Sequence, residues 1–111
     1  LRSLSEGLPE RTLLAPAESL EQQVSHLLVV RVNNRKMVME KLRFAGIDTL
    51  IHYPIPSHLQ APLSTSALVD AQLVHAERHA ATCMTLPSSP WVLKSEISRI
   101  AAELSRAVLK T

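Results

Sequence analysis

The residue types that could do chemistry gather in one short segment, residues 46–60. Proline fixes its own φ and pushes the residue before it toward an extended backbone, so residues 53–56, Tyr-Pro-Ile-Pro, are predicted to be neither helix nor central strand. A stiff loop holds its polar side chains in fixed relative positions, as a ligand site needs. We therefore predict a binding loop whose contact residues are His52, Tyr53, His58 and Gln60.

Each of these four residues also has a purely structural interpretation. His52 could be a half-buried histidine satisfied by backbone carbonyls, or it could line a substrate cleft. Tyr53 could cover the edge of a sheet with its hydroxyl in water, or it could contact a ligand. His58 and Gln60 fit a solvated turn as well as a ligand contact.

Outside the loop, no pattern predicts a catalytic residue or a metal site. His75 and His79 have helical i, i+4 spacing, but no third ligand and no HExxH motif accompany them. Cys83 is expected to be buried, with no base beside it to make it a nucleophile. Glu77 fits either a surface ion pair or an anchor for the proline loop.

Composition limits the function classes. The 111 residues fit one domain, and 46% hydrophobic with 20% charged residues is ordinary globular usage. A net charge of +2 and 3% aromatic residues argue against nucleic acid, for which the pI of about 9.0 is the one favourable sign. A single cysteine and the lack of a long apolar run predict a cytoplasmic protein that neither spans a membrane nor is secreted.

The elements that must position the loop begin with a strand over residues 23–32. Both of its faces are partly apolar, so it is expected to be central, with His26 as a core histidine. Asn33 or Asn34 is expected to cap a helix over residues 34–45, which Gly46 ends in a left-handed conformation. A second strand, residues 49–52, then leads into the proline loop.

After the loop, the pattern predicts a helix over residues 73–81 and a third strand over residues 83–87. Apolar residues at spacings of three and four predict a closing amphipathic helix capped by Ser95. The predicted fold class is α+β, a small, mostly antiparallel sheet of about three strands with helices packed against it. Residues 1–22 are expected to be the end of a truncated interdomain helix, and residues 23–111 the domain itself.

The order of these residues resembles a known family. The core of the resemblance is Gly-Ile-x-Thr-x-Ile-His-Tyr-Pro-x-Pro-x-His-Leu-Gln over residues 46–60, followed by Glu77, Leu86-Pro87 and Pro90. The pattern spans most of residues 24–108 and is similar to the C-terminal domain of DegT/StrS-type sugar-nucleotide aminotransferases. The resemblance implies the small domain of a fold-type I enzyme that depends on pyridoxal phosphate.

Such enzymes move an amino group from an amino acid to a nucleotide-linked keto sugar. In the family the Schiff-base lysine lies in a large N-terminal domain, and Lys36, Lys41, Lys94 and Lys110 do not stand in its expected setting. The resemblance therefore implies that this chain alone neither binds the cofactor nor transaminates. It implies a substrate-binding role for His52, Tyr53, His58 and Gln60.

The implied partners are the N-terminal domain that holds pyridoxal phosphate or a second copy of the chain, with a nucleotide sugar as substrate. A domain that evolved to dock should expose an apolar patch, for which Leu4, Leu8, Leu13 and Leu14 are candidates, so a homodimer is expected. The alternative is a free-standing domain of the same fold that binds a partner or a small ligand.

Overall fold

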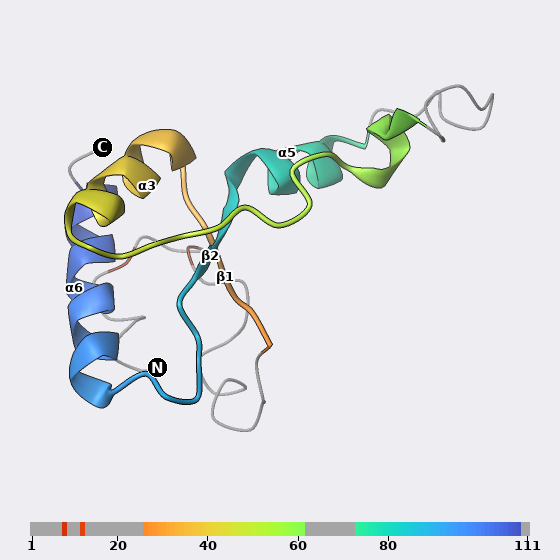
Figure 1. The fold of residues 1–111 in the computed structure, drawn as a ribbon. Helices are drawn as coiled ribbons and strands as arrows, with labels where there is room; N and C mark the ends of the chain where they lie inside the picture. The colour runs from red at the N-terminus through yellow and green to blue at the C-terminus, as the bar shows by residue number, and fades with distance from the viewer. Residues whose placement is uncertain (1–7, 9–11, 13–25, 62–72, 110–111) are drawn as a thin grey trace.

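The computed structural model describes residues 8, 12, 26–61 and 73–109, which fold as an α+β unit. The elements follow in the order β1 (Leu28–Arg31), α3 (Arg35–Phe44), the 3-10 helix η1 (Ser57–Leu59), α5 (Val74–Thr82), β2 (Cys83–Leu86) and α6 (Lys94–Leu109). Helices α3 and α6 lie on one side of the two strands, whereas α5 and the segment before η1 project to the other side (Figure 1). The predicted fold class is confirmed at this level.

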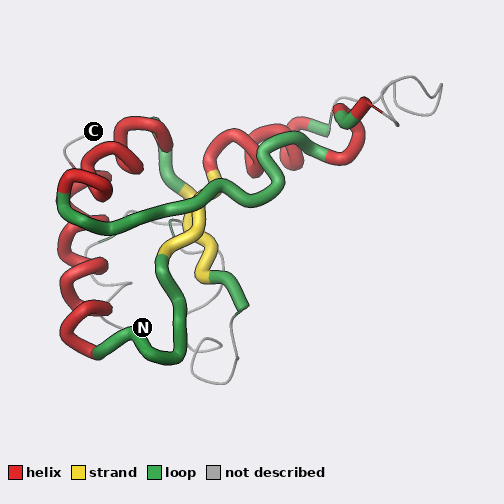
Figure 2. Tube along the Cα trace, viewed as in Figure 1, coloured by secondary structure: helices red, strands yellow, loops and turns green. Residues whose placement is uncertain are grey.

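In the described part of the sheet, β2 lies between two neighbours. β1 and β2 are antiparallel, with Leu28 opposite Leu86 and Arg31 opposite Cys83. β2 is the inner strand of the described part, because Thr85 also pairs with Leu50 on its other edge. All four residues of β2 are buried, whereas β1 is buried at one residue in four. The prediction that the first strand is central stays a prediction, because the N–H of Arg31 on the other edge of β1 donates to Thr12, whose neighbours lie outside the described residues. The two strands lie in the middle of the molecule (Figure 2).

The second predicted strand, residues 49–52, is reduced to the single bridge at Leu50. Leu50 uses its backbone N–H and C=O on Thr85, at 3.2 Å and 2.8 Å. The ladder stops there because Tyr53 has a left-handed backbone and the two prolines that follow carry no N–H to donate. The described residues thus form two strands and one bridge, not three strands.

Helix α3 closely matches its predicted range, and its C-terminus ends as expected. Gly46 has φ +72°, and its N–H donates to the carbonyl of Arg43 at 2.9 Å. The N–H of Ile47 donates to the carbonyl of Leu42, also at 2.9 Å, which completes a Schellman motif with both apolar side chains buried. Asn34 precedes the helix as predicted but has φ 50° and makes no side-chain cap.

Helix α6 begins one residue before its predicted cap. Ser95 lies inside the helix, so the prediction that it caps α6 was wrong. The carboxylate of Glu96 instead accepts the N–H of Leu93 at 2.8 Å, which is the acidic half of a capping box. A carboxylate three residues into the helix reaches back to the free N–H, and it also suits the positive end of the helix dipole.

The core lies where α6 and α3 pack on the sheet. Its most buried large side chains, each below 2% exposed, are Leu42, Met84, Leu86, Leu104, Val30 and Val38. Arg35 adds a polar link to this core, because its guanidinium donates to the carbonyls of Ala80, at 2.5 Å, and Cys83, at 2.9 Å. The start of α3 is thereby tied to the junction of α5 and β2.

Two further sequence expectations have definite outcomes. His26 is exposed and lies before the first residue of β1, so the prediction of a core histidine was wrong. The predicted N-terminal segment, residues 1–22, lies outside the described residues except for Leu8 and Thr12. Leu8 packs against the core, and the carbonyl of Thr12 accepts the N–H of Arg31 at 2.7 Å.

Candidate functional site

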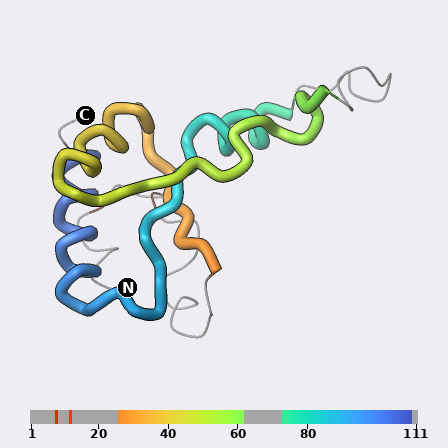
Figure 3. Tube along the Cα trace, viewed as in Figure 1, coloured from red at the N-terminus to blue at the C-terminus, as the bar shows by residue number. Residues whose placement is uncertain are grey.

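The proline loop leaves the sheet at Leu50 and runs beside α5. Figure 3 follows the chain from α3, past the strands and out along α5. The loop and α5 are joined by a side-chain contact between His58 and Glu77, so their closeness does not rest on the view alone. The candidate site is this loop together with the two elements that hold it, α5 and β2.

His52 stands at the start of the loop, with an exposed imidazole. Its Nδ1 lies 2.9 Å from the hydroxyl oxygen of Thr85 in β2. Its described partner is thus a side-chain hydroxyl, not the backbone carbonyls of the structural interpretation. The other ring nitrogen, Nε2, has no hydrogen-bond partner among the described residues.

Tyr53 follows in a left-handed conformation with φ 55°, and its side chain is 82% exposed. A residue with a Cβ loses about 1–2 kcal/mol in this region of backbone space. The exposure leaves little ring surface to cover a sheet edge. The phenol therefore lies largely in solvent instead of packing on the sheet.

His58 faces the protein interior, whereas Gln60 is exposed and bonds back to the loop. His58 is only 8% exposed, and its Nε2 donates to a carboxylate oxygen of Glu77 at 3.1 Å. Gln60 donates to the carbonyl of Ile55 at 3.3 Å and so closes the loop upon itself. His58 is thus neither in a solvated turn nor displayed to solvent, and Glu77 acts as the loop anchor that the sequence left open.

The four predicted residues therefore divide into two pairs. His52 and Tyr53 are displayed, whereas His58 and Gln60 brace the loop. Sequence reasoning missed Thr85, which is 7% exposed and supports His52 from β2. The available signal was a hydroxyl residue between Met84 and Leu86 in an otherwise apolar strand, where a buried polar group needs a partner.

A groove of about 600 Å³ lies between α3 and residues 48–51, next to the start of the loop. Its charged lining includes Lys36 and Arg43 together with Glu40 and Asp48. The mixture of signs creates no uniformly positive field for a phosphate. The exposed polar side chains of the loop are thus a better candidate for ligand binding than this groove.

Cys83 does not add a nucleophile to the site. It is buried, and burial raises the pKa of its thiol above the ordinary value, outweighing the opposite effect of the charges of Arg31 and Arg35. The Sγ lies 3.3 Å from Nδ1 of His79, so the expectation that no base lies beside Cys83 was wrong. A raised pKa keeps the thiol neutral, and the neutral thiol is the unreactive form.

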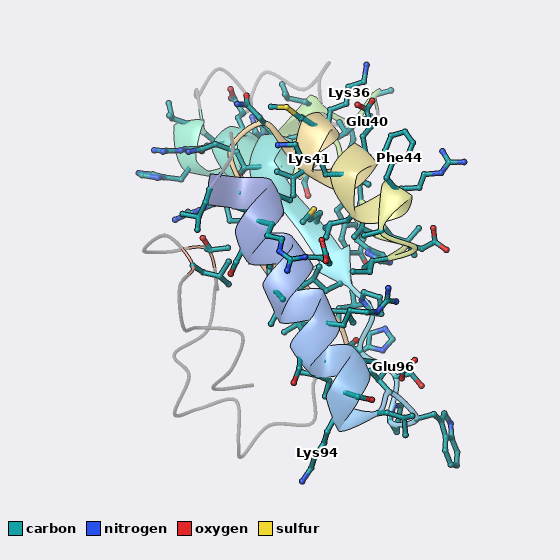
Figure 4. The ribbon with its side chains drawn as sticks, turned by 90° about the vertical axis from the view of Figure 1, so that its left-hand side faces the viewer. Lys36, Glu40, Lys41, Phe44, Lys94 and Glu96 are labelled. Carbon is teal, nitrogen blue, oxygen red and sulfur yellow. The ribbon has the colours of Figure 1, made fainter. Side chains whose placement is uncertain are left out.

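The lysines in the described part lie on helices α3 and α6. Lys36 and Lys41 lie on α3, and Lys94 lies at the end of α6 away from α3 (Figure 4). Nζ of Lys41 donates to the carbonyl of Ala107 at 3.4 Å, whereas Lys36 and Lys94 are exposed on helices. Lys110 lies outside the described residues. Lys36 lines the groove beside residues 48–51 together with Glu40 and Asp48.

The described residues offer neither a metal cluster nor a membrane-spanning helix. No three His, Cys, Asp or Glu side chains lie close enough together to hold a metal ion within residues 26–61 and 73–109. His75 and His79 are exposed on α5. None of the helices in these ranges is both long and apolar enough to cross a bilayer.

Large apolar side chains are exposed along the loop and the start of α5. The exposed set around the site is Leu50, Ile51, Tyr53, Ile55, Leu59, Leu73 and Val74, which we call the apolar arm. Leu8, one of the residues predicted to form a docking patch, is instead partly buried against the core. Leu4, Leu13 and Leu14 lie outside the described residues.

Comparison with known proteins gives one consistent result. A profile of the DegT/DnrJ/EryC1/StrS aminotransferase family matches residues 1–105. The dTDP-3-amino-3,4,6-trideoxy-alpha-D-glucose transaminase of Streptomyces venezuelae is 34% identical over 85% of this chain and 24% of its own length. The dTDP-3-amino-3,6-dideoxy-alpha-D-galactopyranose transaminase of Aneurinibacillus thermoaerophilus is 35% identical over 75% of this chain and 22% of its own.

A solved structure agrees with these relatives. The crystal structure of S. venezuelae DesV in complex with a ketimine intermediate superposes with a TM-score of 0.66 and 32% identity, over 73% of this chain and 22% of that chain. The chain therefore spans about a quarter of the length of the curated relatives it matches.

The strain at Tyr53 can be measured by a matched pair of substitutions. Tyr53→Gly and Tyr53→Ala both remove the exposed ring, but only glycine adopts φ 55° without a Cβ clash. We expect the glycine variant to exceed the alanine variant by about 1 kcal/mol in free energy of unfolding, measured in urea.

Gln60 supplies the control, because it has φ −73° in the same loop. There the order should reverse, with Gln60→Gly less stable than Gln60→Ala, since glycine only adds freedom to the unfolded chain. Equal stabilities of the two Tyr53 variants would show that the left-handed conformation is not kept in solution.

Proposed function

The chain belongs to the DegT/DnrJ/EryC1/StrS aminotransferase family, and on that premise we propose that it is the C-terminal part of a pyridoxal phosphate-dependent enzyme. The enzyme would transfer an amino group from an amino acid to a nucleotide-linked keto sugar. The observation that carries the proposal is a family match over residues 1–105 of a chain that spans about a quarter of its relatives. When bound, the cofactor supplies the electron sink for the transfer.

In this proposal the chain contributes substrate contacts and leaves the cofactor to the rest of the enzyme. The lysine settings support this division, because the described lysines stand on exposed helices or donate to a carbonyl. His52 and Tyr53 would contact the sugar nucleotide from the displayed side of the loop. His58 and Gln60 would serve the same site from within the loop, which they brace.

The proposed partner is the large N-terminal domain or a second copy of this chain. The apolar arm supports this, because side chains such as Leu50, at 63% exposed, and Val74, at 60% exposed, leave apolar surface in water. A partner that covers the arm would also lie against Tyr53. The arm would thus bring a binding loop to the edge of another subunit's or domain's pocket.

The alternative is a free-standing module that binds a partner or a small ligand. One observation favours it: the buried residues of α3, α6 and the two strands form a single cluster with Ile47 and Val32. A chain that completes its own core could fold without a larger enzyme. The two proposals differ in the size of the native product.

The size of the native product tests the proposal directly. The 94 residues aligned with the S. venezuelae relative are 24% of it, so that relative has about 390 residues, enough for more than one domain. An antibody raised against this chain should detect a native product roughly three to four times its 12.3 kDa. A native product of 12.3 kDa would favour the free-standing module.

The role of His52 can be tested in the intact enzyme that contains this chain. His52→Ala should lower kcat/KM at least about tenfold, equivalent to about 1.4 kcal/mol, for transfer from glutamate to a nucleotide-linked keto sugar. His26→Ala is the matched control, because His26 is exposed and lies outside the loop. Equal kcat/KM values for the two variants would mean that His52 is only structural.

Self-association of the isolated chain tests the arm. We expect a dimer or larger species in sedimentation velocity, and Ile55→Ser combined with Leu59→Ser should shift it toward monomer by removing exposed apolar surface. Phe44→Ser is the control, because Phe44 is 93% exposed but points outward from α3 (Figure 4). A wild-type monomer at high concentration would contradict this prediction.

A further inference from the structure

We infer that Thr85 is a positioning residue for His52: its hydroxyl holds the imidazole with the ring hydrogen on Nε2, so that the loop displays an uncharged hydrogen-bond donor. The inference concerns a residue outside the predicted site. The identity of the ligand that receives this donor rests on the proposed function, whereas the geometry of the pair does not.

Thr85 is held firmly enough to position another side chain. It lies in β2, where every residue is buried, and is itself 7% exposed. Its backbone N–H and C=O are both engaged by Leu50, at 2.8 Å and 3.2 Å. The same short pairing places Leu50 and Thr85 side by side, so His52, two residues further on, begins from a fixed point.

The direction of the hydrogen bond follows from what the hydroxyl needs. A hydroxyl has one hydrogen to donate, and Nδ1 of His52, at 2.9 Å, is its recorded contact. If Nδ1 carried the ring hydrogen, it would donate to Thr85 and leave the buried hydroxyl hydrogen without a described acceptor. A buried hydroxyl hydrogen without an acceptor is unfavourable. The hydroxyl therefore donates to Nδ1, and the ring hydrogen of His52 resides on Nε2.

The consequence for recognition is specific. Nε2 lies on the other side of Cε1 from Nδ1, so fixing Nδ1 against β2 fixes the direction of the Nε2–H bond. The imidazole of His52 is exposed, and so is the next residue, Tyr53, which carries a hydroxyl. The loop thus displays two neighbouring polar groups. Two uncharged groups suit the hydroxyl or carbonyl oxygens of a sugar, whereas phosphate is typically bound by charged groups.

The experiment is a long-range ¹H–¹⁵N NMR measurement of the histidine side chains of this chain at about pH 8.5, where an ordinary histidine is neutral. His52→Gln assigns the His52 signals by removing them. In the wild type we expect a single tautomer with hydrogen on Nε2 and an Nδ1 shift typical of an acceptor. A ring with its hydrogen on Nδ1 would overturn the inference.

Three substitutions separate positioning from general stability. Thr85→Val keeps the shape but removes the hydroxyl, so the Nδ1 shift of His52 should move to that of a free imidazole, while Thr85→Ser should restore it. Thr82→Val is the matched control, because the hydroxyl of Thr82 donates to the carbonyl of Arg78 within α5. An unchanged His52 shift in Thr85→Val would also overturn the inference.

A second experiment uses the amino-transfer assay of the intact enzyme. Thr85→Val should raise the KM for the keto sugar about threefold to tenfold, as expected for one weakened hydrogen bond, and Thr85→Ser should recover it. A KM that does not change would overturn the role in recognition. A native product of 12.3 kDa would instead remove the proposed enzyme and leave the NMR result to decide the geometry.

Discussion

The candidate site depends on how one residue, Thr85, distributes its three polar groups. Its backbone N–H and C=O fix Leu50, and its hydroxyl contacts His52. All three interactions face the segment that becomes the proline loop, while the rest of β2 is buried against the core. A loop that leaves a sheet edge normally gains mobility within a few residues. Here Leu50 and His52, at the start of the loop, are both held by Thr85 of β2.

The second anchor extends the same arrangement along the chain. Glu77 in α5 holds His58, and Thr85 in β2 holds His52, so one continuous segment grips the loop at two points six residues apart. Arg35 bonds to this segment between the two anchors, at Ala80 and Cys83. Arg35 begins α3, which packs on α6. Its hydrogen bonds therefore connect these helices to the segment that holds the loop. Two fixed ends and two prolines then leave Tyr53 as the residue that absorbs the turn, with φ 55°.

The sequence predicted the features that depend on local chemistry. Helix α3 followed from its period and from Gly46, whose missing Cβ permits the left-handed end that the Schellman motif needs. The stiffness of the loop followed from its prolines. The second strand was overestimated because an apolar run does not reveal which neighbours it acquires: residues 49–52 kept one bridge, to β2. The cap of α6 was missed for a related reason, since Ser95 and Glu96 are both acceptable N-terminal residues and only the position of Leu93 decides between them. Thr85 escaped notice because its importance comes from a contact 33 residues away in sequence.

The balance of exposed and buried surface around the braced loop supports the proposal that this loop meets a partner. Packing Ile55 and Leu59 inside the domain would add stability, but both side chains stay more than half exposed. The side-chain hydrogen bonds of His58 and Gln60 hold the loop in this shape. Rigidity in a segment that makes few apolar contacts of its own does not increase the stability of the core. It does reduce the entropy that the loop would lose on meeting a partner or a ligand, which is the general benefit of preorganisation. Tyr53 lies between the two anchors, and its left-handed backbone costs about 1–2 kcal/mol that the surrounding structure must offset. The loop is therefore supported by two contacts to α5 and β2 while large apolar side chains along it stay exposed.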